Sequence, residues 1–131
     1  MVEMALLATY RVCTIYFYLG GLSVSKAVIT SYTLLDFMSE ADMNGFFSFV
    51  ESNMEPHAAN LRANGMTKFY ISRVFNKGDK FTIGNWLEYE NQEAFVACDK
   101  IWQEFLKVSS SNFDFITKVV PYRGIVQYDF S

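Results

Sequence analysis

The fold is decided by residues 66–90, which read MTKFYISRVFNKGDKFTIGNWLEYE. Residues 66–75 and 80–90 are rich in β-branched and aromatic side chains, a composition typical of strands. Between them, residues 76–79 (NKGD) supply the Asn, Gly and Asp that short connections between antiparallel strands favour. The segment therefore predicts a β-hairpin.

Side chains alternate between the two faces of a strand, so this hairpin has one predominantly apolar face. The apolar members of that face are Phe69, Ile71, Phe75, Phe81, Ile83, Leu87 and Tyr89. Asn85 is the polar exception in the second strand, and Arg73 lies between Ile71 and Phe75 in the first. We expect this face to pack against the rest of the domain.

The segment before the hairpin predicts a strand and then a helix. Residues 26–37 are β-branched and aromatic without Pro or Gly, which favours a strand. Ser39 suits the N-cap of a helix, with Asp42 three residues later in a weaker form of the capping box. Pro56 removes a backbone donor, so we expect a kink or a restart there. Asn64 and Gly65 predict the end of the helix.

The segment after the hairpin predicts a second helix and a last strand. Asn91 suits an N-cap, and apolar side chains follow it at helical spacing: Phe95, Cys98, Trp102 and Phe105. Residues 109–112 form a polar break. Residues 118–130 predict a strand, and Pro121 and Gly124 within it favour an edge strand or a bulge.

The predicted order is strand, helix, strand, strand, helix, strand, an α+β arrangement of two split βαβ units. Its four strands form one antiparallel sheet with both helices on one face. The other face is predicted to carry Val28, Tyr32, Leu34, Tyr70, Val74, Trp86, Val120, Tyr122, Val126 and Tyr128. Because an apolar patch of this extent marks an interface, we expect a second copy to cover it in a homodimer or higher even oligomer.

Composition limits the function classes. The chain has 131 residues, 51% apolar and 18% aromatic, with a formal net charge of −3. The length fits one domain, predicted over residues 25–131. The aromatic content excludes a disordered chain, and two cysteines do not make a disulfide scaffold. The mildly acidic balance argues against nucleic acid as a partner.

Residues 1–24 form an apolar N-terminal extension with Arg11 near its middle. Three interpretations remain open for it: an extra strand or extension, a removable leader, or a membrane anchor. Its content of Thr, Tyr, Val and Ile favours the strand or extension. We therefore expect no membrane association and a cytoplasmic protein.

Two motifs resemble those of a known group. Asn64-Gly65 precedes the hairpin, and residues 89–95, YENQEAF, lead from its second strand into the next helix. A Gly before the second strand, an aromatic at the end of the third and a Glu-Ala-aromatic helix start resemble the dimeric α+β barrel superfamily, closest to its antibiotic-biosynthesis-monooxygenase-like domains. The resemblance covers residues 26–130 and implies a ferredoxin-like fold that pairs into a dimeric barrel.

The chain departs from that pattern at three positions. Many members of the group carry a Trp where this chain has Tyr89, a Glu where it has Leu87, and a His where it has Cys98. The heme-degrading members resemble the chain in fold only, because their Asn, Trp and His set has no match here. The resemblance thus implies a fold and a site location, and not an oxygenase activity.

His57 and Asn85 are the candidate catalytic residues. His57 is the only histidine, and as a general base it would accept a proton from a phenol or enol held between helix and sheet. The alternative is a surface or helix-packing histidine. A buried Asn85 amide must find partners, so it orients a substrate oxygen or bonds a backbone group at a bulge beside Gly84.

The candidate substrate-binding residues are Tyr70, Arg73, Asn85, Trp86 and Tyr89. Aromatic rings suit a flat hydrophobic ligand, and they equally suit core and dimer packing. Arg73 pairs with a carboxylate or reaches an anionic ligand. Cys98 is interpreted as a buried structural thiol. No spacing in the sequence predicts a metal site or a phosphate-binding loop, so we expect neither metal nor organic cofactor.

Two functions follow as hypotheses. In the first, the protein is a cofactor-independent monooxygenase or isomerase that deprotonates a small aromatic compound. In the second, it is a non-catalytic dimeric module for ligand binding, sensing or stress. A cavity of several hundred Å³ that joins His57, Asn85 and Tyr89 would favour the first, and a filled interior the second.

Overall fold

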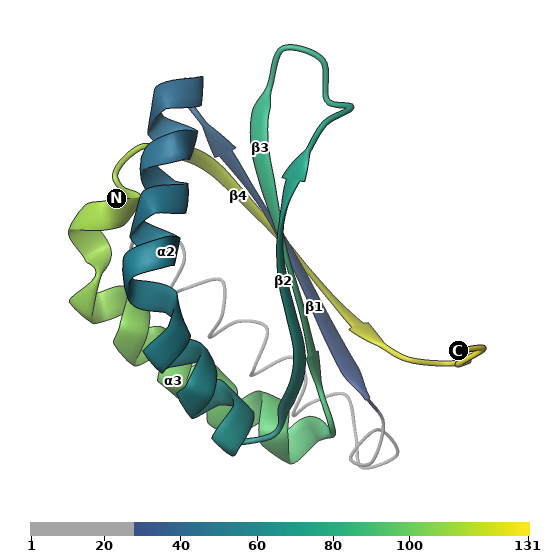
Figure 1. Cartoon of the computed structure of the whole chain (residues 1–131). Helices are drawn as coiled ribbons and strands as arrows, with labels where there is room; N and C mark the ends of the chain where they lie inside the picture. The colour runs from purple at the N-terminus through teal and green to yellow at the C-terminus, as the bar shows by residue number, and fades with distance from the viewer. Residues whose placement is uncertain (1–27) are drawn as a thin grey trace.

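The computed structural model describes residues 28–131, and Figure 1 shows one sheet with two long helices against one of its faces. The elements are β1 Ile29–Phe37, α2 Glu40–Ala63, β2 Met66–Val74, β3 Phe81–Tyr89, α3 Gln92–Val108, the short 3-10 helix η2 Ser110–Phe113, and β4 Ile116–Ile125. The strands are antiparallel in the order β2-β3-β1-β4. The predicted α+β fold is therefore confirmed.

Helix α2 begins and ends at the predicted residues. The Ser39 hydroxyl accepts a hydrogen bond from the Asp42 amide at 3.1 Å, which satisfies one of the free donors of the first turn. At the other end, the Gly65 amide donates to the Arg62 carbonyl at 3.2 Å. Gly65 has a φ of 104°, in the left-handed region that favours glycine.

Of the two alternatives predicted at Pro56, a kink or a restart, the restart is wrong, because α2 runs through Pro56 as one helix of 24 residues. Figure 1 shows its axis bending as it crosses the sheet. Proline removes one hydrogen bond, and a helix tolerates that loss when tertiary packing holds both halves in place. Met54 and Leu61, on either side of Pro56, are both buried in the core.

Helix α3 begins as predicted, with the Asn91 side chain accepting from the Ala94 amide at 2.8 Å. Phe95, Cys98 and Trp102 are buried against the sheet side. The polar break after α3 contains η2, which buries Phe113 in the core. This segment therefore connects α3 to β4 and also places the Phe113 side chain in the core.

The sheet differs from the prediction at two ends. Phe75, expected on the apolar face, follows the end of β2 and is 94% exposed at the start of the hairpin turn. Strand β4 spans Ile116–Ile125 and not residues 118–130, because within residues 28–131 no strand pairs with the chain beyond Val126. β4 is an edge strand, as Pro121 and Gly124 predicted.

Cross-strand register separates the two faces of the sheet. Thr33 lies opposite Asn85, which lies opposite Ile71, so this row faces the helices. The next row faces away from them and is aromatic in all four strands: Tyr122 in β4, Tyr32 in β1, Trp86 in β3 and Tyr70 in β2. We call this second side the open face. The predicted alternation is confirmed.

The rings on the open face pack against one another and against the backbone. The Tyr32 and Trp86 ring centroids are 5.6 Å apart, and the Trp86 indole donates to Glu88 at 2.9 Å. Tyr32 also lies across Gly84, where an added Cβ would come within 2.6 Å of its hydroxyl oxygen. The row is thus a continuous aromatic surface, with Tyr70 and Tyr122 more than half exposed at its two ends.

The predicted role of residues 1–24 lies outside the described residues. Among the helices within residues 28–131, none has the length and apolar character needed to cross a membrane.

Two glycine-to-alanine substitutions are expected to change stability in opposite directions. At Gly65 a Cβ would lie 2.4 Å from the Cβ of Ala94 and would occupy a left-handed backbone, so Gly65→Ala should lower the free energy of unfolding by at least about 2 kcal/mol. Gly45, inside α2, has open space around it, and Gly45→Ala should raise stability by about 1 kcal/mol. Urea denaturation measures both, and equal effects would contradict the assigned helix end.

Candidate functional site

The predicted substrate-binding residues lie on both sides of the sheet. Asn85 and Tyr89 face the helices and are buried, at 7% and 2% exposure. Tyr70 and Trp86 lie on the open face, opposite each other in the register of β2 and β3. Since the sheet itself separates the two pairs, these residues do not meet around one ligand within a protomer.

Arg73 is on the helix side of β2, near the end of the sheet edge. Its guanidinium pairs with the Glu40 carboxylate at 3.0 Å, and about half of each side chain is exposed. The predicted carboxylate partner is therefore present. An exposed pair of this kind contributes little to stability, and it ties Arg73 to the first turn of α2, away from the interior.

His57 is enclosed between the two helices. Its ring is stacked on Phe105, with centroids 3.9 Å apart, and lies edge-on to Trp102 at 4.3 Å. Burial lowers the pKa of His57 from 6.5 to about 4, because the surrounding rings do not solvate an imidazolium. Of the roles considered for His57, a histidine that packs between helices is the one that fits this position. His57 stays neutral at physiological pH.

Asn85 lies at a small cavity between the sheet and the helices. The cavity has a volume of about 20 Å³ and is walled mostly by apolar side chains, among them Phe46, Trp102, Phe105 and Phe113. Within residues 28–131, the Asn85 Oδ1 atom is buried and finds no hydrogen-bond partner. A space of this size fits a single water molecule, and β3 has no bulge beside Gly84 that would bring a backbone donor to it.

His57 and Tyr89 do not line that cavity. The Tyr89 ring packs edge-on against Phe95, with centroids 5.5 Å apart, near the other end of β3. The interior therefore does not join the three side chains that a catalytic pocket was expected to combine. Large aromatic rings occupy the space instead.

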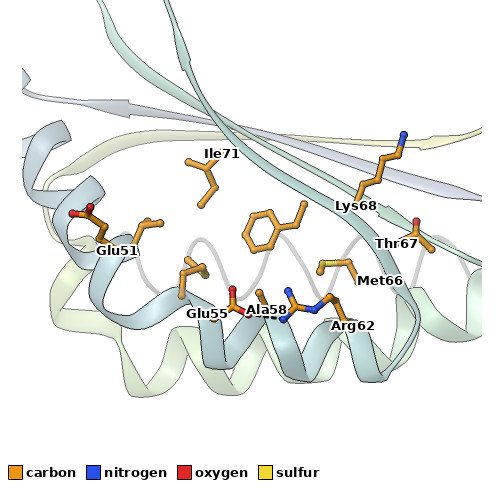
Figure 2. A pocket seen from close by; sticks show the side chains of 11 residues that line it. Glu51, Glu55, Ala58, Arg62, Met66, Thr67, Lys68 and Ile71 are labelled. Atoms are coloured by element: carbon orange, nitrogen blue, oxygen red, sulfur yellow. Dashed lines mark hydrogen bonds and ion pairs between the residues drawn. The ribbon is translucent and has the colours of Figure 1, made fainter.

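A wider space lies between α2 and the edge strand β2, and we call it the α2–β2 groove (Figure 2). Its volume is about 450 Å³. The apolar residues that line it come from both elements: Val50, Met54, Ala58, Met66, Phe69 and Ile71. Figure 2 shows Ala58 on the helix facing Met66 and Ile71 on the strand side, so helix and strand form opposite walls.

Charged side chains form the rim of the groove. Glu55 and Arg62, seven residues apart on α2, make an exposed ion pair across two turns of the helix. Glu51 lies one turn before Glu55 on the same helix, and Lys68 points away from α2 (Figure 2). The site thus has an apolar floor, a charged rim and no single dominant charge, an arrangement that suits a small hydrophobic compound.

The sequence did not identify the groove. Phe69 and Ile71 were expected to pack against the rest of the domain, and their half-buried positions at the sheet edge follow only from the strand order. The spacing of Glu55 and Arg62 indicates only that they share one exposed face of the helix, and no local signal marks the strand wall of the groove.

Cys98 has no evident chemistry. Burial raises the pKa of the Cys98 thiol to about 11, and the thiol faces the carbonyls of Leu61 and Asn64 at 3.6 and 3.7 Å. Cys98 is thus the buried structural thiol that was expected. In the part of the chain that the structure describes, no three His, Cys, Asp or Glu side chains are grouped to hold a metal ion.

The low pKa of His57 has a direct consequence for stability. The His57 imidazole binds a proton near pH 6.5 in the unfolded chain and near pH 4 in the folded chain. The free energy of unfolding should therefore fall as the pH drops from about 6.5 to about 4, by at most about 3 kcal/mol. His57 is the only histidine, so its imidazole NMR signals are unambiguous. With this low pKa they should not titrate between pH 5.5 and 7.5. His57→Gln should remove this part of the pH dependence, and a midpoint near 6.5 in the folded protein would contradict its burial.

The fold is similar to that of several solved proteins, although no curated protein matches the sequence. A dimeric ferredoxin-like protein from an uncultured marine organism is 26% identical, over 79% of this chain and 98% of that one, with a TM-score of 0.73. A second dimeric ferredoxin-like protein from an uncultured marine organism is 24% identical, over 83% and 96%, with a TM-score of 0.70.

A more distant similarity connects the fold to oxygenases. The monooxygenase from the gene ActVA-Orf6 of Streptomyces coelicolor, solved in complex with Nanaomycin D, is 8% identical over 81% of this chain and 93% of that one, with a TM-score of 0.60. At that identity the similarity establishes the fold alone. Together these structures confirm the resemblance to the dimeric α+β barrel group.

The family itself follows from the sequence match. Residues 26–126, more than half of the chain, match the family described as Domain of unknown function (DUF6974). The chain therefore belongs to the DUF6974 family.

Proposed function

We propose that this chain is the subunit of a homodimeric, non-catalytic binding module that takes up a small hydrophobic compound in the α2–β2 groove. The observation that carries the proposal is a contrast in free space, about 20 Å³ beside Asn85 against about 450 Å³ in the groove. Sites for small molecules are clefts of roughly 300–1,000 Å³ with mostly apolar walls. Of these two spaces, only the groove has that size.

The homodimer is proposed from the open face. The aromatic row of Tyr122, Tyr32, Trp86 and Tyr70 spans all four strands, and an apolar patch of that extent on one side of a sheet marks an interface. A second copy that packs its own open face there would close a barrel, and about 800 Å² buried per subunit is ordinary for a stable dimer. Both marine neighbours are described as dimeric, which supports this assembly.

A binding role is favoured over catalysis because the reactive side chains are dispersed. A general base must lie within hydrogen-bond reach of the proton that it removes. His57 lies between helices, enclosed by Trp102 and Phe105, and Arg73 is engaged by Glu40 at the sheet edge. Neither lines the cavity beside Asn85 or the α2–β2 groove.

A single charge on the open face should weaken the dimer. Tyr122, 56% exposed on an edge strand, can be replaced without opening the core, so Tyr122→Lys should fold and raise the dimer Kd at least tenfold. Val108→Lys, at a 77% exposed position on α3, is the control and should leave the Kd within twofold. Sedimentation equilibrium measures both, and a wild-type chain that is monomeric at micromolar concentration would overturn the dimer.

The groove should bind a neutral, two-ring hydrophobic probe such as N-phenyl-1-naphthylamine. Ile71→Glu adds a charge to the groove wall and should weaken binding at least tenfold, as measured by fluorescence titration. Ile101→Glu, on the outer surface between α2 and α3, is the matched control and should leave binding unchanged. Loss of binding in the control alone would place the probe between the helices and contradict the proposal.

A second candidate function rests on Asn85. Its Oδ1 is buried without a partner in an aromatic-walled cavity, and a phenol or enol hydroxyl donating to that oxygen would satisfy it. A cofactor-independent monooxygenase or isomerase of small aromatic compounds would use the amide in this way, after the rings of Phe105 or Phe113 move aside. Oxygen uptake with quinols or anthrone-like phenols that Asn85→Leu abolishes would favour this candidate.

A cytoplasmic location stays a prediction from the sequence.

A further inference from the structure

The arginines along the α2–β2 groove are already engaged by carboxylates. Arg62, at one end of the groove, pairs with Glu55 on the same helix. Arg73, further along β2, pairs with Glu40 in the first turn of α2 at 3.0 Å. Opposite charges at such short distances largely cancel each other's field. Neither arginine therefore leaves a free positive charge at the groove.

Lys68 is the other cation among the residues that line the groove, and its charge lies on the far side of β2. Figure 2 shows its side chain pointing away from α2. In the sheet it lies opposite Glu88, two residues after Trp86 and so on the open face. The pKa of Asp129 is lowered by hydrogen bonds from Ser131 and further by Lys68. Lys68 thus compensates negative charge outside the groove.

Glu51 is the charged residue of the groove that has no partner. Within residues 28–131, its carboxylate makes no ion pair and no hydrogen bond. It precedes Glu55 by one helical turn, and two like charges at this spacing repel each other. Arg62 bonds Glu55 and lies at the other end of the groove (Figure 2). The rim therefore carries one uncompensated negative charge, at the Glu51 end.

The surface beside this carboxylate is apolar. Val50 and Met54 flank Glu51 on α2, and Ile71 lies on the strand wall. Low-dielectric walls around a charge of one sign strengthen its attraction for the opposite sign. A ligand that complements this end of the groove needs an apolar body with a positive group at its end.

We infer that the α2–β2 groove takes a hydrophobic monocation, an ammonium group on an apolar body, with the nitrogen at Glu51 and the apolar part on Met54 and Phe69. The inference rests on the proposed function and names the chemistry of its ligand. A neutral compound would use the apolar lining alone. A carboxylate would meet both Glu51 and Glu55, and like charges disfavour it.

The test compares octylammonium, 1-octanol and octanoate, which share one chain length and differ in the charge of the head group. Each displaces N-phenyl-1-naphthylamine from the full chain near pH 7, where the amine is protonated and the carboxylate ionised. At a low ionic strength of about 10 mM, screening is weak. Octylammonium should bind at least about threefold tighter than octanol, the size expected for an exposed charge pair, and octanoate should bind more weakly than octanol.

Two charge-neutralising variants assign the preference to one carboxylate. Glu51→Gln keeps the length and polarity of the side chain and removes its charge, so the preference for octylammonium over octanol should disappear. Glu104→Gln is the matched control, because Glu104 is exposed on α3, outside the groove, and its loss changes the net charge by the same amount. This control should retain the preference.

The outcomes separate the ligand chemistry from the groove itself. Failure of both octanol and N-phenyl-1-naphthylamine to bind overturns the proposed function. If both bind, and octylammonium or octanoate binds as octanol does, the charge preference is overturned and the groove remains a binding site. A preference that persists in Glu51→Gln, or that is lost in Glu104→Gln, also overturns the inference, because the selection for charge would then arise elsewhere.

Discussion

Among the residues that the structure describes, helices cover only one side of the sheet, and this constraint governs the molecule. In this chain the uncovered side carries aromatic rings in register across all four strands, from Tyr122 to Tyr70. Hydrophobic burial is the main favourable term in folding and association. The exposed rings on this face of a single protomer do not contribute to it. The oligomeric state and the placement of any ligand site both depend on how this surface is covered.

The helix-covered side has the opposite character, because it is closely filled. Phe46, Phe49, Phe105 and Phe113 form a connected set of ring contacts between the helices and η2. Such rings contribute both buried area and specific edge-to-face geometry. The same rings leave about 20 Å³ beside Asn85, so the site location implied by family resemblance is occupied by the protein's own side chains. The α2–β2 groove at the sheet edge is one of the wider spaces that remain.

Local chemistry made much of the fold predictable. Ser39, Asn91 and Gly65 mark helix ends through hydrogen bonds and a backbone conformation that neighbouring residues supply, and strand alternation assigned the open face before any strand order was known. At Pro56 the sequence predicted a kink or a restart, and the helix bends without restarting, because the packing of the residues around Pro56 outweighs one lost hydrogen bond.

The functional residues were less accessible to that reasoning. Whether Tyr70 and Asn85 share a site depends on which face each occupies, and alternation separates them by the thickness of the sheet. His57 looked suited to proton transfer, and only the rings of Trp102 and Phe105 around it reveal that it stays neutral. The α2–β2 groove depends on β2 being an edge strand, a property of the strand order and not of any local segment.

Gly84 gives the aromatic surface its shape, because the Tyr32 ring lies flat across the missing side chain. A Cβ at this position would lie 2.6 to 3.0 Å from three atoms of Tyr32, so any larger residue would force the ring to move. In the proposed dimer, the shape of the shared surface then depends on a residue that contributes no side chain to it.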